Sequence, residues 1–162
     1  MIEAKDTANV VAPPPLLALA AVVLGLLLDH VAPAYLLDVL LSWGTRILLG
    51  LELIVAGLAL AVAALRGFRS VGTNPEPWKP STALFSTGVF AWLRNPMYVG
   101  GTAALIGLAL LLASDWMVVT TVILALVLHF GVVLREERYL EAKFGDAYRQ
   151  YKARVPRYGI PT

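Results

Sequence analysis

The chain has 162 residues, of which 59% are hydrophobic and only 15% charged, and its mean hydropathy is +0.74. Soluble domains of this size are rarely so apolar, and the apolar residues are gathered in long runs, so the composition predicts an integral membrane protein. The net charge of +2 gives no reason to expect nucleic acid as a partner, and the absence of cysteine excludes disulfides and thiolate metal sites. With only two histidines, no metal site is expected.

Four apolar runs follow a polar segment, Met1–Asn9, and each is interpreted as a membrane span. A helix needs about 20 apolar residues to cross the hydrocarbon core. The last two runs are separated only by Ser114 and Asp115, so they are expected to form a helical hairpin. The sequence thus predicts an all-α, polytopic membrane helix bundle that forms a single domain over residues 1–162. The expected spans are 16–37, 47–65, 97–113 and 116–134.

The second run contains one charged residue, Glu52. A carboxyl group inside a span is costly unless it is paired. Glu52 is therefore either a functional group or a protonated or paired side chain that faces a neighbouring helix. Gly57 and Ala61, four residues apart in the same run, predict a stripe along which another helix approaches closely.

The basic residues indicate the orientation in the membrane. Eleven of the 13 lysines and arginines lie in two regions, the connection 66–94 and the C-terminal tail 135–162. The positive-inside rule places both regions in the cytoplasm, and four spans then place both termini there, as in a multi-pass protein of a bacterial or archaeal inner membrane. The connection is rich in proline and glycine and is long for a simple link, and long loops are often functional.

The tail begins with a polar sequence that is expected to continue the fourth helix as far as Phe144. Gly145 is a typical residue after a helix end, and Asp146 favours the start of another helix. His129, in the fourth span, precedes Glu136 by seven residues, so both are expected on one face of the helix.

The stretch Gly88–Gly100 joins the connection to the third span. Asn95 can cap a helix and Pro96 suits its first turn. A helix start presents free N–H groups and a positive dipole end, which suit an anionic group such as a carboxylate. The topology brings this helix start close to Glu136 and Glu137. The alternative interpretation is a well-capped membrane helix beside snorkelling arginines and a solvated acidic turn.

Two separated motifs carry a family resemblance. RNPMYVG at 94–100, followed by REERYLEAKFGDAYRQYKARVP at 135–156, resembles the group of isoprenylcysteine carboxyl methyltransferases and phospholipid methyltransferases. That group has an Arg-His-Pro-x-Tyr-x-Gly stretch, a helical hairpin, a Glu-Glu pair and a Phe-Gly-x-x-Tyr-x-x-Tyr tail. The resemblance covers roughly residues 72–161. It implies a membrane enzyme that binds S-adenosylmethionine at the cytoplasmic face and methylates a lipophilic or small acceptor taken from the bilayer.

The resemblance implies that the connection and the tail together form the cofactor site. Glutamate would pair with the cationic or hydroxyl groups of S-adenosylmethionine, and Arg94 or the helix start would take its carboxylate. Two residues depart from the family pattern: Asn95 replaces a histidine, and Val132 stands where the prenyl-protein enzymes have a substrate-binding arginine, so a carboxylate acceptor is in doubt. No catalytic residue is assigned. The implied cofactor-binding residues are Thr82, Leu84, Phe85, Phe90, Arg94, Asn95, Pro96, Met97, Tyr98, Glu136 and Glu137.

Two other functions stay open at this point. Membrane reductases of the sterol-reductase type share part of the C-terminal pattern and use a nicotinamide cofactor, but this chain is short for them. A non-catalytic membrane protein could also keep the hairpin as a scaffold or a small-ligand binder. The sequence leaves the acceptor and the oligomeric state undetermined.

The orientation is directly testable. Because the basic residues predict cytoplasmic termini, reporter fusions or single introduced cysteines after Asp38 and after Asp115 should react only with reagents outside the cell. Labelling of either position from the cytoplasmic face alone would overturn the four-span topology.

Overall fold

A computed structural model describes residues 6–159, and all regular structure within that range is helical. Three helical segments are long and apolar enough to cross a membrane: α1, α3, and a continuous rod formed by α5, the π-helical turn η2 and α6. The helix α4 is apolar but shorter. The predicted all-α membrane bundle is therefore confirmed. The first residues of the polar segment Met1–Asn9 and the last three of the tail lie outside the described range. The elements are α1 Pro14–Val31, α2 Leu36–Leu40, α3 Trp43–Ser70, η1 Gly88–Ala91, α4 Pro96–Leu112, α5 Asp115–Leu128, η2 His129–Val133, α6 Leu134–Phe144 and α7 Asp146–Arg154.

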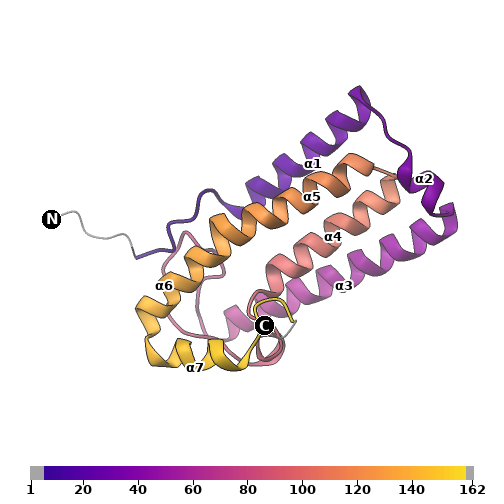
Figure 1. Cartoon of the computed structure of the whole chain (residues 1–162). Helices are drawn as coiled ribbons and strands as arrows, with labels where there is room; N and C mark the ends of the chain where they lie inside the picture. The colour runs from indigo at the N-terminus through magenta and orange to yellow at the C-terminus, as the bar shows by residue number, and fades with distance from the viewer. Residues whose placement is uncertain (1–5, 160–162) are drawn as a thin grey trace.

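The long helices pack in the order α3, α4, α5 and α1, with their axes roughly aligned (Figure 1). The expectation that the first span extends to Leu37 is wrong, because α1 ends at Val31. Pro33 has no N–H group and disfavours helical geometry at the residue before it. The chain then forms the separate short helix α2, and the carboxylate of Asp115 accepts the backbone N–H groups of Leu36 and Leu37 at 3.0 Å each.

The pair α3 and α4 is packed with almost no side-chain volume between the two backbones. A Cβ atom at Gly100 would overlap the carbonyl oxygen of Gly57, and one at Gly107 would lie 2.6 Å from the carbonyl oxygen of Gly50. Small residues allow such an approach, and in a membrane the resulting van der Waals contact is a main source of helix association. The predicted close approach at Gly57 is confirmed.

Glu52 does not face a neighbouring helix, contrary to one of the two interpretations. Its side chain lies on the exposed side of α3 and pairs with no other residue in the range that the structure describes. Gly50 and Gly57 lie on the buried side of α3, and the helical period places Glu52, two residues after Gly50, on the opposite side.

The C-terminal part follows the sequence prediction closely. The rod ends at Phe144, Gly145 adopts a positive φ of 54°, and α7 begins at Asp146. Because Gly145 lacks a Cβ atom, it can take this conformation and reverse the chain. The α7 helix therefore turns back under the end of the bundle, where it buries Tyr148 and Tyr151 (Figure 1).

The tight packing of α3 on α4 predicts unequal effects of alanine at two adjacent glycines. Gly100→Ala should destabilise the fold by about 1–3 kcal/mol through overpacking. Gly101→Ala should be neutral or stabilising, because a Cβ atom there meets nothing within 4 Å and alanine favours a helix. Unfolding of each variant in detergent provides the measurement. Equal stabilities of the two variants would contradict the close contact.

Candidate active site

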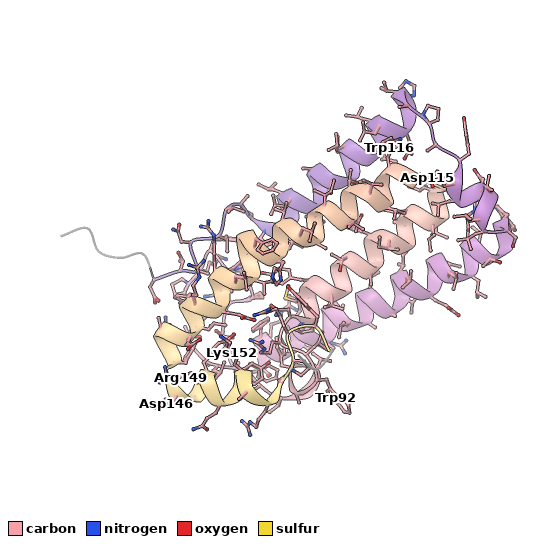
Figure 2. All side chains as sticks on the ribbon, viewed as in Figure 1. Trp92, Asp115, Trp116, Asp146, Arg149 and Lys152 are labelled. Carbon is pink, nitrogen blue, oxygen red and sulfur yellow. The ribbon has the colours of Figure 1, made fainter. Side chains whose placement is uncertain are left out.

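Polar and charged side chains gather at the end of the bundle where α4 begins and α6 ends (Figure 2). Segments far apart in the sequence meet there: the connection after α3, the start of α4, α6, α7 and the segment that follows α7. Their common core is a cluster of buried residues that includes Phe90, Tyr148 and Tyr151. The hydroxyl of Tyr151 donates to the carbonyl oxygen of Phe90 at 2.8 Å, so α7 is fixed to η1 inside this core.

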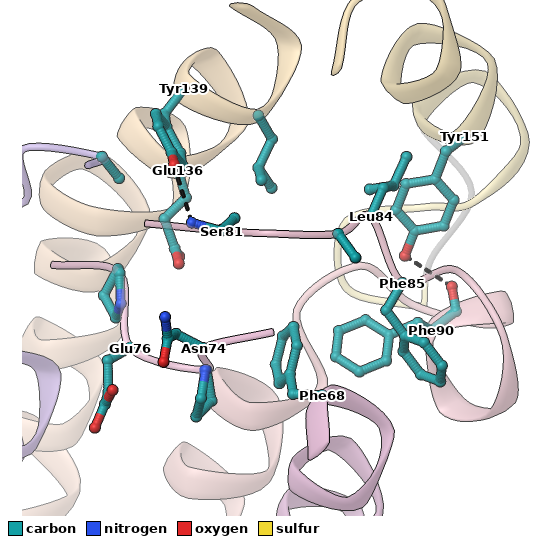
Figure 3. A pocket seen from close by; sticks show the side chains of 15 residues that line it. Phe68, Asn74, Glu76, Ser81, Leu84, Phe85, Phe90, Glu136, Tyr139 and Tyr151 are labelled. Atoms are coloured by element: carbon teal, nitrogen blue, oxygen red, sulfur yellow. Dashed lines mark hydrogen bonds between the residues drawn. The ribbon is translucent and has the colours of Figure 1, made fainter. Parts of the chain in front are cut away.

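The first of two small cavities, the aromatic cavity, has a volume of about 70 Å³ and lies between α6, the connection and the end of α3 (Figure 3). Three phenylalanine rings form one wall. The rings of Phe68 and Phe85 each meet the ring of Phe90 edge to face, at centroid distances of 4.9 and 5.4 Å. The opposite wall carries Glu136 and Tyr139 of α6, and the hydroxyl oxygen of Tyr139 accepts the backbone N–H of Ser81 at 3.0 Å.

The second cavity, the polar cavity, measures about 60 Å³ and shares Phe90 and Glu136 with the first. Much of the remaining lining consists of Arg94, Asn95, Met97, Tyr98 and Glu137. The hydroxyl of Tyr98 donates to Oε2 of Glu136 at 2.8 Å, whereas Oε1 accepts no hydrogen bond from any described residue. One carboxylate oxygen of Glu136 is thus available at the boundary of the two cavities.

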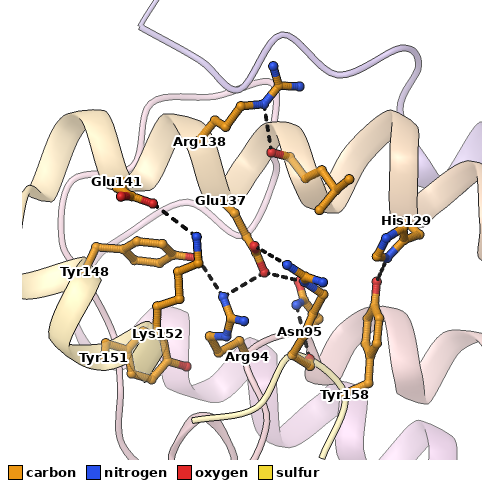
Figure 4. A network of polar contacts seen from close by, with 12 residues as sticks. Arg94, Asn95, His129, Glu137, Arg138, Glu141, Tyr148, Tyr151, Lys152 and Tyr158 are labelled. Atoms are coloured by element: carbon orange, nitrogen blue, oxygen red, sulfur yellow. Dashed lines mark hydrogen bonds and ion pairs between the residues drawn. The ribbon is translucent and has the colours of Figure 1, made fainter. Parts of the chain in front are cut away.

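Glu137, only 5% exposed, holds two arginines (Figure 4). Its Oε1 accepts from Nη1 of Arg94 at 2.7 Å and from Nε of Arg157 at 2.8 Å, and its Oε2 accepts from Nη2 of Arg157 at 2.8 Å. The hydrogen bond to Glu137 raises the pKa of Arg157, and burial raises the pKa of Tyr148, beside Arg94, to about 12, so Tyr148 is neutral at physiological pH. Both oxygens of Glu137 are therefore occupied within the protein.

Arg94 keeps a buried donor that is not used. Its side chain is 6% exposed, and its Nε is buried without a hydrogen-bond partner among the described residues. A buried donor left unpaired costs free energy, about 1–3 kcal/mol for an ordinary group and more for a charged one. Because Arg94 lines the polar cavity, its unpaired N–H favours binding of a ligand there that carries a hydrogen-bond acceptor.

The segment that follows α7 crosses the start of α4. The carbonyl oxygen of Pro156 accepts the backbone N–H of Arg94 at 3.0 Å, and that of Arg157 accepts from Nδ2 of Asn95 at 3.2 Å. The prediction that the side chain of Asn95 caps α4 is wrong, because its Oδ1 accepts no N–H of the helix; its Nδ2 instead holds the side chain toward the crossing segment. Pro96 does begin the helix, and no side chain caps it. The first N–H groups of α4 are thus not satisfied by a capping side chain.

Most of the residues expected at the cofactor site line one of the two cavities, and two do not. Pro96 is buried within the first turn of α4. Thr82 serves the connection itself, because its N–H donates to Oγ1 of Thr73 and its hydroxyl donates to the carbonyl oxygen of Gly72. The lining residues are Leu84, Phe85, Phe90, Arg94, Asn95, Met97, Tyr98, Glu136 and Glu137.

Sequence reasoning also missed several lining residues. Tyr148 and Tyr151 belong to the Phe-Gly-x-x-Tyr-x-x-Tyr stretch, which was therefore a usable signal. Phe68 lies in the last turns of an apolar helix, and no local pattern distinguishes it from the rest of the span.

His129 is the clearest departure from the expected arrangement. A regular helix would place it on the face of Glu136, but it lines neither cavity. The π turn η2, His129–Val133, lies between the two residues. A π turn widens the helix by one residue, and one residue rotates a helix by about 100°. The predicted shared face is therefore wrong.

Removing the negative charge of Glu137 should strongly destabilise the protein. Glu137→Gln leaves Arg94 and Arg157 without their counter-charge, and breaking a buried pair costs about 3–5 kcal/mol. Glu141, on the same helix, forms a partly exposed ion pair with Lys152 of α7, so Glu141→Gln should cost less than about 1 kcal/mol. Denaturant unfolding in detergent compares the two variants, and a small, equal loss in both would contradict the structural role of Glu137.

Sequence similarity identifies the family. Residues 45–147 match the sequence model of a family described as phospholipid methyltransferase. The chain is 40% identical over 81 residues to the protein-S-isoprenylcysteine O-methyltransferase of Schizosaccharomyces pombe, which covers 48% of this chain and 33% of that protein. It is 39% identical over 62 residues to an uncharacterized protein of Haemophilus influenzae, covering 38% of this chain and 98% of that protein.

The matched region thus spans only a third of the length of the fission yeast enzyme. No solved structure gives a significant match. The family match extends over more than half of the chain, from the start of α3 to the start of α7, and contains every residue that was expected at the cofactor site. The chain therefore belongs to the phospholipid methyltransferase family of membrane proteins.

Proposed function

We propose that the protein transfers a methyl group from S-adenosylmethionine to a lipophilic or small acceptor, and that the cofactor binds at the cytoplasmic end of the bundle. One observation carries this proposal. Glu136 presents an available carboxylate oxygen at the boundary between an aromatic cavity and a polar cavity, and the polar cavity contains a buried, unpaired nitrogen of Arg94.

These groups fit the chemistry of the cofactor. S-adenosylmethionine has cationic groups, ribose hydroxyls, a carboxylate and a flat purine, and when bound it supplies an activated methyl group. Glu136 suits the cations or hydroxyls, and Nε of Arg94, with the uncapped start of α4, suits the carboxylate. Phe85 and Phe90 provide apolar surface for the purine. The protein's task is then to position and orient the reactants and to supply matching charge.

The connection has to move when the cofactor binds. The cavities measure about 70 and 60 Å³, whereas ligand sites usually have about 300–1,000 Å³. The wall formed by residues 74–85 is attached to α6 by the bond from Ser81 to Tyr139, and to the N-terminal segment by the bond from Ala8 to Pro77. Few bonds are lost when this wall moves outward, so we infer that the segment closes over bound cofactor.

Two largely apolar grooves lead from the bilayer to the proposed cofactor site, one on each face of the α4–α5 hairpin. The groove on the side of α1 and α3 measures about 600 Å³ and runs over the face of α4 and α5. It shares Pro75, Met97 and Tyr98 with the polar cavity, and Trp78 and Arg69 lie at its end near the membrane surface. This continuity supports an acceptor with an apolar chain. The relative from fission yeast is named for a prenylated cysteine, but the short region of similarity leaves the acceptor of this chain a proposal.

The alternatives make different predictions. A nicotinamide-dependent reductase would bind a reduced dinucleotide, and a scaffold would bind neither cofactor. The membership in a methyltransferase family favours methyl transfer over both.

Glu136→Gln tests the cofactor site, because it removes one charge with little change of shape. A hydrogen bond to a charged group contributes roughly 1.5–3 kcal/mol, so the affinity for S-adenosylmethionine should fall about tenfold to more than a hundredfold. Glu141→Gln, on the same helix but lining neither cavity, should leave the affinity unchanged. The measurement is a calorimetric titration of each detergent-solubilised variant.

Folding of each variant is checked by thermal melting. Equal affinities of the wild type and both variants would remove Glu136 from the site. If the wild type binds a reduced nicotinamide dinucleotide instead, or neither cofactor, the proposed methyl transfer from S-adenosylmethionine is rejected.

A further inference from the structure

A second groove, here named the His129 groove, measures about 540 Å³ and is lined by α4, α5, η2 and Tyr158 but by no residue of α1 or α3. Its walls are mainly apolar. Leu126 and Phe130 line it and are 55% and 64% exposed, so it opens on the side of the bundle that the membrane covers. Tyr98 lines both this groove and the polar cavity, so the groove reaches the edge of the proposed cofactor site.

The polar end of the groove is a pair of side chains. Nδ1 of His129 lies 2.7 Å from the hydroxyl oxygen of Tyr158 (Figure 4), while Nε2 has no hydrogen-bond partner among the described residues. The π turn η2 directs His129 to this side of the helix. Such turns are frequent at functional sites. Tyr158 is fixed by its neighbour Arg157, which is bound to Glu137.

We propose, on the basis of the methyl transfer proposed above, that His129 accepts the proton of the methyl acceptor and that Tyr158 positions it. In this arrangement Nδ1–H donates to the oxygen of Tyr158, which leaves the lone pair of Nε2 free to face the groove. The hydrogen bond made by one ring nitrogen fixes the tautomer, and the other ring nitrogen is then the base.

This assignment also selects the class of acceptor. The polar groups that line the groove, Tyr98, Thr102, His129 and Tyr158, include no lysine, arginine or carboxylate. A carboxylate would lose its hydration there without gaining a counter-charge, which is costly. An alkylamine is cationic at neutral pH and is excluded for the same reason. A neutral thiol at the end of an apolar chain fits the groove, because its sulfur carries a proton that an imidazole can accept.

In the transfer step a lone pair of the acceptor's sulfur forms a bond to the methyl carbon, and the bond from that carbon to the cofactor's sulfonium sulfur breaks with its electron pair left on the cofactor. The proton of the acceptor passes to Nε2 of His129. Tyr158, which is 37% exposed, connects the imidazolium to water, where the proton is released.

The groove on the other face of the hairpin, between α1 and α3, is the competing place for the acceptor. It offers Arg69 and Glu76 but no imidazole. Trp78 lines that groove only, so its indole N–H reports on the competing site.

Nuclear magnetic resonance of the full chain in micelles, labelled with ¹⁵N, tests the assignment without turnover. The chain has only two histidines, and His30→Gln assigns their signals. We expect neutral His129 to carry its proton on Nδ1, and Tyr158→Phe to abolish that preference. Decanethiol should shift the His129 signals, whereas decanoate should not. A proton on Nε2, or shifts confined to the indole of Trp78, would overturn the proposal.

Methyl transfer to decanethiol gives the second measurement. General base catalysis contributes typically 10²–10⁴-fold, so His129→Gln should lower the rate about a hundredfold or more while the affinity for S-adenosylmethionine stays unchanged. His30→Gln, at the opposite end of the bundle, is the control.

The two proposals fail in different ways. If S-adenosylmethionine binds and His129→Gln keeps the wild-type rate, the role of His129 is rejected and the cofactor site stands. If S-adenosylmethionine does not bind, methyl transfer from it is rejected as well.

Discussion

The structure of the candidate site depends on the carboxylate of Glu137. Buried at the membrane edge, it joins Arg94 at the start of α4 to Arg157 in the segment that follows α7. These elements have no other ion pair with one another among the described residues. A buried charge is tolerated only when its counter-charges and hydrogen bonds are in place. The pairing therefore determines where α4 begins relative to α6, and it holds the C-terminal segment across the start of α4.

The same interaction places the groups with proposed functions. Glu136 follows the geometry of its neighbour: with Glu137 held by two arginines, the side chain of Glu136 is turned to the boundary of the two cavities, where Tyr98 donates to it. Arg94 is held by one nitrogen, which leaves Nε free. Tyr158 is carried to His129 because Arg157 is bound. One buried carboxylate thus organises both the proposed cofactor site and the pair of side chains that we assign to the acceptor.

The features that local chemistry determines were predictable from the sequence. Apolar run length predicted the membrane helices, Gly145 predicted the break between α6 and α7, and Gly57 with Ala61 predicted a close contact with another helix. The remaining features depend on tertiary partners. Asn95 suits a helix cap by residue type, but its side chain is oriented by a hydrogen bond from Nδ2 to the carbonyl oxygen of Arg157, which only the folded chain reveals. The π turn at His129 has no signature in residue type, and a single added residue in that helix is enough to separate His129 from Glu136.

The central claim is that this end of the bundle binds S-adenosylmethionine, and thermal unfolding of the wild-type protein in detergent tests it most directly. A ligand that binds only the folded state raises stability by about 2.7 kcal/mol at a hundred times its dissociation constant. We expect a concentration-dependent rise in the unfolding temperature with S-adenosylmethionine and with its demethylated product, and none with a reduced nicotinamide dinucleotide. A rise with the dinucleotide alone, or with none of the three, would contradict the account.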